Sequence, residues 1–115
     1  MLKITESNVT IMVKNMDKAI SFYQSIGLTL KNRWDDHYAM LTTTDITIGL
    51  HPGGDKKSGS GSVSIGFMVD KIAPAKKLLS KNNIPYKEDE GKSGIYLHFR
   101  DLDGTVLYFT EPKWR

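Results

Sequence analysis

The sequence predicts an α+β fold built from two tandem βαβββ modules. The order strand, helix, strand, strand, strand can be read twice along the chain, with a Gly/Ser/Lys-rich stretch between the two copies. An internal duplication of about 50 residues restricts the choice of fold more than a single motif does. The 115 residues suit one domain, residues 1–115, with module one at about 7–51, a linker at about 52–61 and module two at about 62–112.

Module one begins with a strand whose side chains alternate. In residues 8–13, NVTIMV, every second residue is Val or Ile, which is typical of a half-buried strand. Apolar residues then recur at helical spacing between Asn15, a suitable N-cap, and Gly27, a suitable helix stop. Three further strands are expected at residues 28–34, 37–42 and 45–51.

Module two repeats this order after the linker. The stretch at residues 62–69, SVSIGFMV, alternates in the same way, and apolar residues recur at helical spacing over residues 70–83. We expect Asp70 to cap this helix, Pro74 to lie in its first turn, and Asn82 and Asn83 to end it. Three strands should follow at residues 84–89, 94–100 and 105–110.

Composition and charge exclude several classes of function. The net charge is +3, and the lysines are scattered, whereas nucleic-acid-binding surfaces carry a denser basic stripe. No nucleic-acid partner is therefore expected. No apolar run approaches the ~20 residues that a membrane span needs, and the N-terminus lacks the regions of a signal peptide, so no membrane partner is expected. The absence of cysteine fits a cytoplasmic protein.

Three stretches in this order resemble one known superfamily. They are the opening strand and helix, VTIMVKNMDKAISFYQSIGLTL, the restart SIGFMVDKIAPAKKLLSKNNIPY, and the closing FRDLDGTVLYFTEP. Together they resemble the vicinal oxygen chelate superfamily, which holds glyoxalase I, extradiol dioxygenases, fosfomycin-resistance proteins and bleomycin-resistance proteins. The resemblance implies curved mixed sheets around a cavity, and usually a homodimer.

The resemblance also implies where a metal would be bound. The metal enzymes of the superfamily use a histidine on the first strand of each module and a glutamate on the last strand. These positions fall on Asn8, Ser64 and Tyr108. Asn and Ser are weak neutral donors, and a tyrosine binds iron only as a phenolate, so the set offers no charge to neutralise a divalent cation. We therefore expect no metal ligand and no cofactor.

Alternation identifies the side chains that should line the cavity. If the Val, Ile, Leu and Phe positions of each strand pack under the helices, the intervening side chains face the cavity, provided that no bulge interrupts the strand. The resulting lining is aromatic and polar, contains methionines as flexible apolar filler, and shows no carboxylate. The expected ligand-binding residues are Asn8, Tyr38, Met40, Ser64, Met68, Tyr96, His98 and Tyr108.

Two functions from different classes are consistent with this lining. The first is a glyoxalase/bleomycin-resistance-like protein that binds a small, partly aromatic or polar organic ligand in a metal-free cavity, with resistance or sequestration as its role. The second is a glyoxalase- or dioxygenase-type lyase, isomerase or oxygenase. It would use a displaced metal or acid–base chemistry at the catalytic candidates His98 and Tyr108. The missing metal ligands favour the first function.

Overall fold

The computed structural model describes residues 3, 8–53 and 64–113. The chain divides into two compact units, Met1–Gly59 and Ser60–Arg115. Within the described residues, each unit contains one α-helix and one four-stranded mixed sheet. The predicted α+β fold with two βαβββ modules is therefore confirmed, whereas most of the predicted linker lies outside the described residues. Neither helix in these ranges is long and apolar enough to cross a membrane.

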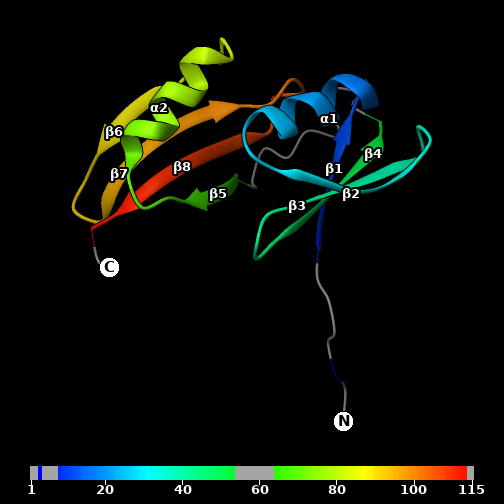
Figure 1. The fold of residues 1–115 in the computed structure, drawn as a ribbon, viewed down its shortest axis with the longest axis horizontal. Helices are drawn as coiled ribbons and strands as arrows, with labels where there is room; N and C mark the ends of the chain where they lie inside the picture. Colours follow the sequence, from blue (N-terminus) through cyan, green and yellow to red (C-terminus); the bar gives the residue numbers. More distant parts are fainter. Residues whose placement is uncertain (1–2, 4–7, 54–63, 114–115) are drawn as a thin grey trace. The chain divides into compact units, whose positions relative to one another are not determined.

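Module one contains a helix and four strands. They are β1 (Asn8–Val13), α1 (Met16–Ser25), β2 (Thr29–Trp34), β3 (Tyr38–Thr42) and β4 (Thr47–Pro52). The strand order in the sheet is β1-β4-β3-β2, and α1 lies across one face (Figure 1). β1 and β4 are parallel, while β3 is antiparallel to both of its neighbours. The register of β2 shifts between Leu30 and Asn32, so this edge strand carries an irregularity of the β-bulge type.

Module two repeats the same topology. Its elements are β5 (Ser64–Met68), α2 (Ile72–Lys81), β6 (Lys87–Glu90), β7 (Gly94–Arg100) and β8 (Val106–Pro112). The strand order is β5-β8-β7-β6, with β5 and β8 parallel and the other pairs antiparallel. α2 covers one face of this sheet (Figure 1). The equivalence of the two modules therefore extends from the order of the elements to their pairing.

The core of each module forms between its helix and the alternating apolar side chains of its sheet. On β5, Ile65 and Phe67 are buried, whereas Ser64 and Met68 are exposed. This is the alternation that the sequence predicts. The large side chains that are completely buried are Val13, Tyr23, Leu41, Ile48, Leu50, Leu79, Leu97 and Leu107.

The ends of α1 follow the sequence prediction. The side chain of Asn15 accepts a hydrogen bond of 2.9 Å from the backbone N–H of Lys18, so Asn15 is the N-cap. Gly27 follows the helix with φ of +113°, a conformation that glycine adopts without a β-carbon clash. After α2, Asn82 is the C-cap and Asn83 occupies the position equivalent to Gly27 with φ of +58°, so the prediction that Asn82 and Asn83 end this helix is confirmed.

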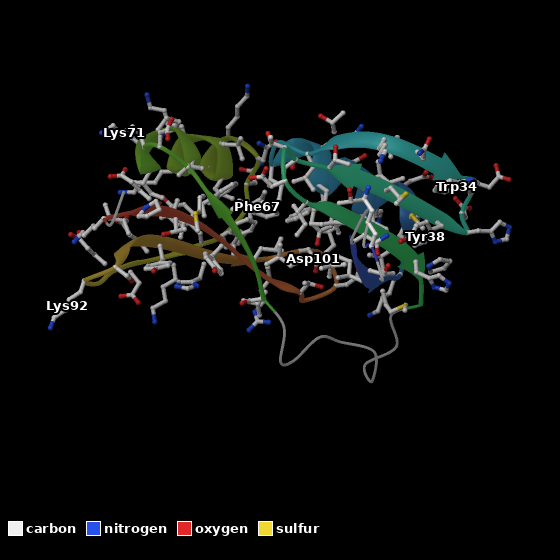
Figure 2. The ribbon with its side chains drawn as sticks, turned by 90° about the horizontal axis from the view of Figure 1, so that it is seen from below. Trp34, Tyr38, Phe67, Lys71, Lys92 and Asp101 are labelled. Atoms are coloured by element: carbon white, nitrogen blue, oxygen red, sulfur yellow. The ribbon has the colours of Figure 1, made fainter. Side chains whose placement is uncertain are left out.

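The prediction that Asp70 caps α2 is wrong. The residue at the N-cap position is Lys71, which makes no side-chain capping bond; Figure 2 labels it at the start of the helix. Instead, Glu111 Oε1 on β8 accepts a hydrogen bond of 2.7 Å from the backbone N–H of Ile72. A carboxylate at a helix N-terminus also interacts favourably with the helix dipole. Local capping rules did not identify Glu111 because it lies 39 positions from Ile72 in the sequence.

Ion pairs and an aromatic contact hold the hairpin that carries Tyr38. Arg33 donates hydrogen bonds of 2.7 Å to the carboxylates of Asp17 on α1 and Asp36 in the turn. These bonds raise the pKa of Arg33 above its ordinary value. The rings of Trp34 and Tyr38 lie side by side, with centroids 5.9 Å apart (Figure 2). The hairpin thus fixes Tyr38 at the start of β3.

Candidate functional site

The face of the module-two sheet opposite α2 carries three neighbouring aromatic side chains. Tyr96 and His98 are two residues apart on β7 and so share a face, and Tyr108 on β8 is the cross-strand partner of His98. The centroids of each pair among these three rings are 5.9 Å apart. Sheet register and alternation define the aromatic face, whose members are Ser64, Gly66, Met68, Tyr96, His98, Tyr108 and Thr110.

Gly66 provides the space that the ring of Tyr108 occupies. The two residues are partners in the parallel pairing of β5 and β8. A β-carbon added at Gly66 would collide with the ring and hydroxyl of Tyr108. Any other residue at position 66 would therefore displace the phenol, so Gly66 determines where Tyr108 lies on the aromatic face.

Tyr96 and His98 form a stacked pair with an interplanar angle of 14°. The hydroxyl of Tyr96 forms a hydrogen bond of 2.7 Å with Ser93 Oγ, which holds the outer end of the ring. Within the described ranges, His98 makes ring contacts with Tyr96 and Tyr108 and no hydrogen bond. Its two ring nitrogens are therefore available to donate a hydrogen bond to a ligand or accept one from it.

The equivalent face of module one has a different arrangement. Sheet register makes Tyr38 the equivalent of Tyr96, and Gly49 the equivalent of Tyr108. Tyr38 extends over Gly49, where an added β-carbon would collide with the phenol, and its hydroxyl lies 2.9 Å from Thr10 Oγ1. One hydrogen-bonded phenol thus crosses this face, in place of the cluster of three rings in module two.

The eight predicted ligand-binding residues form two groups, one in each module. The structure brings Tyr96, His98 and Tyr108 into mutual contact. Exposed Ser64 and half-exposed Met68 lie on the neighbouring strand β5. The group on the corresponding face of module one consists of Asn8, Tyr38 and Met40. That either group binds a ligand stays a prediction.

The edge strand β6 adds two charged side chains that sequence reasoning missed. Lys87 pairs with His98, and Asp89 pairs with Tyr96, and cross-strand partners share a face. One carboxylate, that of Asp89, therefore shares the side of the sheet that was expected to carry none. All four residues of β6 are exposed and none is apolar, so its sequence does not indicate which side chains face the helix. The pairing partners on β7 supply that information.

A separate surface hollow lies at the turn between β3 and β4 in module one. Its volume is about 570 Å³, and hydroxyl-bearing threonines dominate its walls. It contains no aromatic ring, so it differs in chemistry from the predicted binding site. Its lining consists of Lys31, Thr42, Thr43, Thr44, Asp45, Ile46 and Thr47.

A match to a protein-family model identifies the family of the chain. The model of the Glyoxalase/Bleomycin resistance protein/Dioxygenase superfamily matches residues 7–109. The chain belongs to this superfamily. The resemblance expected from the sequence is thereby confirmed. A comparison with curated proteins finds no match.

Solved structures of the superfamily share this fold at low sequence identity. A bleomycin-binding protein in complex with bleomycin is 16% identical, with a TM-score of 0.74 and coverage of 96% of this chain and 100% of the other. The fosfomycin resistance protein FosX from Listeria monocytogenes, in complex with Mn(II) and sulfate, is 15% identical, with a TM-score of 0.80 and coverage of 96% and 93%. A glyoxylase/bleomycin resistance protein/dioxygenase domain from Frankia sp. EAN1pec is 21% identical, with a TM-score of 0.75 and coverage of 95% and 92%. At these identities the likeness concerns the fold alone.

The metal position that the superfamily implies does not fit the residues of this chain. Asn8, Ser64 and Tyr108 supply an amide, a hydroxyl and a phenol, which together carry no negative charge while the phenol is protonated. The phenol of Tyr108 is packed against Gly66. In the part of the chain that the structure describes, no three His, Cys, Asp or Glu side chains are grouped so that they could hold a metal ion. The side chains at these three positions are therefore unsuited to hold a divalent metal ion.

Proposed function

We propose that this superfamily member binds a small planar organic molecule on the aromatic face of module two, and that no metal ion takes part in the binding. The observation that carries the proposal is the contact among Tyr96, His98 and Tyr108, whose ring centroids are 5.9 Å apart in each pair. The proposed role is sequestration of the ligand without a change in its bonds.

The side chains of the aromatic face suit stacking combined with a few hydrogen bonds. Tyr96 and Tyr108 offer ring surfaces as well as hydroxyls, and each aromatic contact contributes about 0.5–1.5 kcal/mol beyond simple burial. His98 offers two nitrogens that no other described residue engages in a hydrogen bond. Met68 is unbranched and 55% exposed, so it can adapt its shape to a ligand at little cost.

The charges near this face favour a ligand without net charge. Lys87 and Asp89 lie on the edge strand β6 and carry opposite signs, and Arg100 at the end of β7 donates a hydrogen bond of 2.9 Å to the backbone oxygen of Gly104. The fields of Lys87 and Asp89 partly cancel, and both side chains are exposed to screening by solvent. A neutral ligand loses little hydration energy on such a face, whereas a charged ligand would leave water without a buried partner of opposite charge.

An acid–base enzyme is the second candidate function. His98 and Tyr108 are cross-strand partners with contacting rings, which places a nitrogen base near a phenol. An efficient general base is usually oriented by a further hydrogen-bonding group. His98 has none within the described residues, and this observation favours binding over catalysis.

The proposal includes a homodimer in the cytoplasm. The family resemblance supports the dimer, and the cysteine-free sequence is compatible with a reducing compartment. Light scattering coupled to gel filtration measures the oligomeric state. A monomer at all protein concentrations would contradict this part of the proposal and leave the binding site itself untouched.

Calorimetric titration of chelator-treated protein with 2-naphthol tests the binding function. We expect saturable binding in the presence of EDTA. Tyr108→Leu should weaken it roughly three- to tenfold, the loss of one aromatic contact. Tyr86→Leu is the matched control, because Tyr86 is a half-buried tyrosine of module two that lies outside the aromatic face.

Each outcome of this titration favours one function. Binding that is weakened roughly three- to tenfold in Tyr108→Leu and unchanged in Tyr86→Leu supports the aromatic face as the site. Binding that appears only after Mn(II), Fe(II), Ni(II) or Zn(II) is added would contradict the metal-free site. Conversion of the probe that depends on His98 would favour the acid–base enzyme.

A further inference from the structure

Thr110 on β8 carries a buried hydroxyl that has no hydrogen-bond partner in the part of the chain that the structure describes. Its Oγ1 is buried and unpaired among the described residues, and only 5% of the residue is exposed. Buried hydroxyls are almost always hydrogen-bonded, because an unmet donor or acceptor destabilises the folded state. The position of Thr110 in the sheet indicates which groups can reach its hydroxyl.

Sheet register places this hydroxyl on the aromatic face. Thr110 lies two residues beyond Tyr108 on the same strand, so the two side chains share a side of the sheet. The cross-strand partners of Thr110 are Tyr96 on β7 and Met68 on β5. The unpaired hydroxyl therefore lies between an aromatic ring and a flexible methionine, beside the cluster of three rings.

Met68 is the neighbour that can give access to the hydroxyl. It is 55% exposed, and its unbranched side chain changes rotamer easily. Tyr96, in contrast, is held by its hydrogen bond to Ser93 and by stacking on His98. A ligand that displaces the Met68 side chain would reach Thr110 while keeping the ring of Tyr96 as a wall.

The charged residues of this face are distant from Thr110 in the sheet. The strand order β5-β8-β7-β6 places β7 between β8 and the edge strand that carries Lys87 and Asp89. Arg100 lies on the same side of β7, four residues from Tyr96, the partner of Thr110. The polar group at this point is thus an uncharged hydroxyl, which both donates and accepts. It suits an uncharged oxygen of a ligand rather than a carboxylate or an ammonium group.

We infer that Thr110 is the polar anchor of the binding site and that the ligand is a neutral aromatic molecule with a hydroxyl or carbonyl oxygen on its ring. The inference rests on the proposed function and specifies its ligand class. The ring packs against Tyr96 and Tyr108, and the oxygen takes the place of the Met68 side chain and forms a hydrogen bond with Thr110 Oγ1. This bond satisfies the hydroxyl that residues 8–53 and 64–113 leave unpaired.

Two probes of matched shape test the anchor. 2-Naphthol carries an oxygen on its ring, and 2-methylnaphthalene carries a methyl group at the same place. Calorimetry or fluorescence gives the ratio of their affinities for wild-type protein, Thr110→Val and Thr110→Ser. Valine keeps the shape of threonine without its hydroxyl, and serine keeps the hydroxyl. We expect the preference for 2-naphthol to fall roughly three- to tenfold in Thr110→Val, the loss of one hydrogen bond, and to persist in Thr110→Ser.

A readout that needs no ligand accompanies the titration. If the hydroxyl is unpaired in the free protein, Thr110→Val removes an unmet polar group, so the thermal midpoint of the ligand-free variant should equal or exceed that of the wild type. A lower midpoint, or failure of the variant to fold, would show that the hydroxyl already has a partner such as a bound water, and would overturn the inference.

The titration separates failure of the anchor from failure of the proposed function. If both probes bind and their affinity ratio is the same in wild type and Thr110→Val, Thr110 is not the anchor, but the aromatic face remains the proposed binding site. If neither probe binds to the wild-type protein, the proposed function itself is wrong. A ratio that falls in Thr110→Val and persists in Thr110→Ser supports the anchor.

Discussion

The ring of Tyr108 lies over the backbone of Gly66, at the place where any other residue would put its β-carbon. Module one repeats the relationship with different partners, since Tyr38 lies over Gly49. In each module, therefore, a glycine on one strand admits a tyrosine from a neighbouring strand. The duplicated fold keeps the glycine–tyrosine contact and changes which strand supplies each residue, and this gives the two faces different shapes.

A methyl group at position 66 should move Tyr108 without unfolding the protein. In Gly66→Ala the new β-carbon meets the end of the tyrosine ring, which can turn away from a half-buried position. We expect the free energy of unfolding to change by less than about 1 kcal/mol, because the strain offsets the reduced chain entropy of alanine. Binding of 2-naphthol should weaken. Denaturant melts and calorimetry measure the two effects.

The control is Gly66→Ala in a protein that lacks the tyrosine ring at position 108. In the background Tyr108→Ala, the change Gly66→Ala has no phenol to displace, so its effect on binding should vanish. An equal effect in both backgrounds would show that alanine acts through the β5 backbone rather than through Tyr108.

Removal of the Glu111 carboxylate should destabilise α2. Glu111 Oε1 accepts the hydrogen bond of Ile72 N–H at the start of the helix, and the loss of a capping acceptor costs about 0.5–2 kcal/mol. Glu111→Ala should therefore lower the free energy of unfolding by that amount in denaturant melts. Glu111→Gln keeps an acceptor oxygen and should recover most of the loss; equal stability of all three proteins would contradict the cap.

The turn before β8 should depend on the buried carboxylate of Asp101. Asp101 Oδ1 accepts hydrogen bonds from the backbone N–H groups of Asp103, at 2.9 Å, and Thr105, at 2.7 Å. Asp101→Ala leaves these donors unmet, at a cost of about 1–3 kcal/mol for a buried donor. Thermal and denaturant melts measure the loss. Asp101→Asn retains one oxygen and should be the milder variant.

The ion pair of Glu90 with Lys113 should make stability depend on pH in the acidic range. Lys113 Nζ donates a hydrogen bond of 2.8 Å to Glu90 Oε2, and this bond holds the pKa of Glu90 below its ordinary value. A carboxylate whose pKa is lower in the folded state stabilises the fold above its unfolded pKa. This contribution is lost as the pH falls through the folded pKa.

Thermal midpoints over a pH series test this pair. Glu90→Gln should be less stable than wild type near neutral pH, and the difference should disappear in acid. In Lys113→Gln, the pKa of Glu90 should return toward its ordinary value, as measured by NMR titration of the Glu90 carboxyl group. A carboxyl titration that is identical with and without the Lys113 ammonium group would argue against the pair.

The sequence predicts the strands and most helix ends because their signals are local. Alternation in NVTIMV places β1 over residues 8–13, as observed, and Asn15 and Gly27 mark the ends of α1 through their own side chain and backbone. The repeat then predicts the second module from the first. These elements depend on neighbours within a few positions of the chain.

The features that sequence reasoning missed depend on contacts between different elements of the fold. The cap of α2 comes from Glu111, and the cross-strand pairing of Asp89 with Tyr96 determines which face its carboxylate joins. By strand alternation Thr110 shares a side of the sheet with Tyr108, but only the three-dimensional packing shows that its hydroxyl is buried and unpaired among the described residues.

The most direct test of metal-independent binding on the aromatic face is an NMR map of 2-naphthol binding to chelator-treated protein. Backbone amide shifts should change at Ser64–Met68, at residues 96–98 and at residues 108–110, with EDTA present throughout. Shifts confined to the Thr42–Thr47 hollow or to module one, or shifts that appear only after a divalent metal is added, would contradict metal-independent binding on the aromatic face.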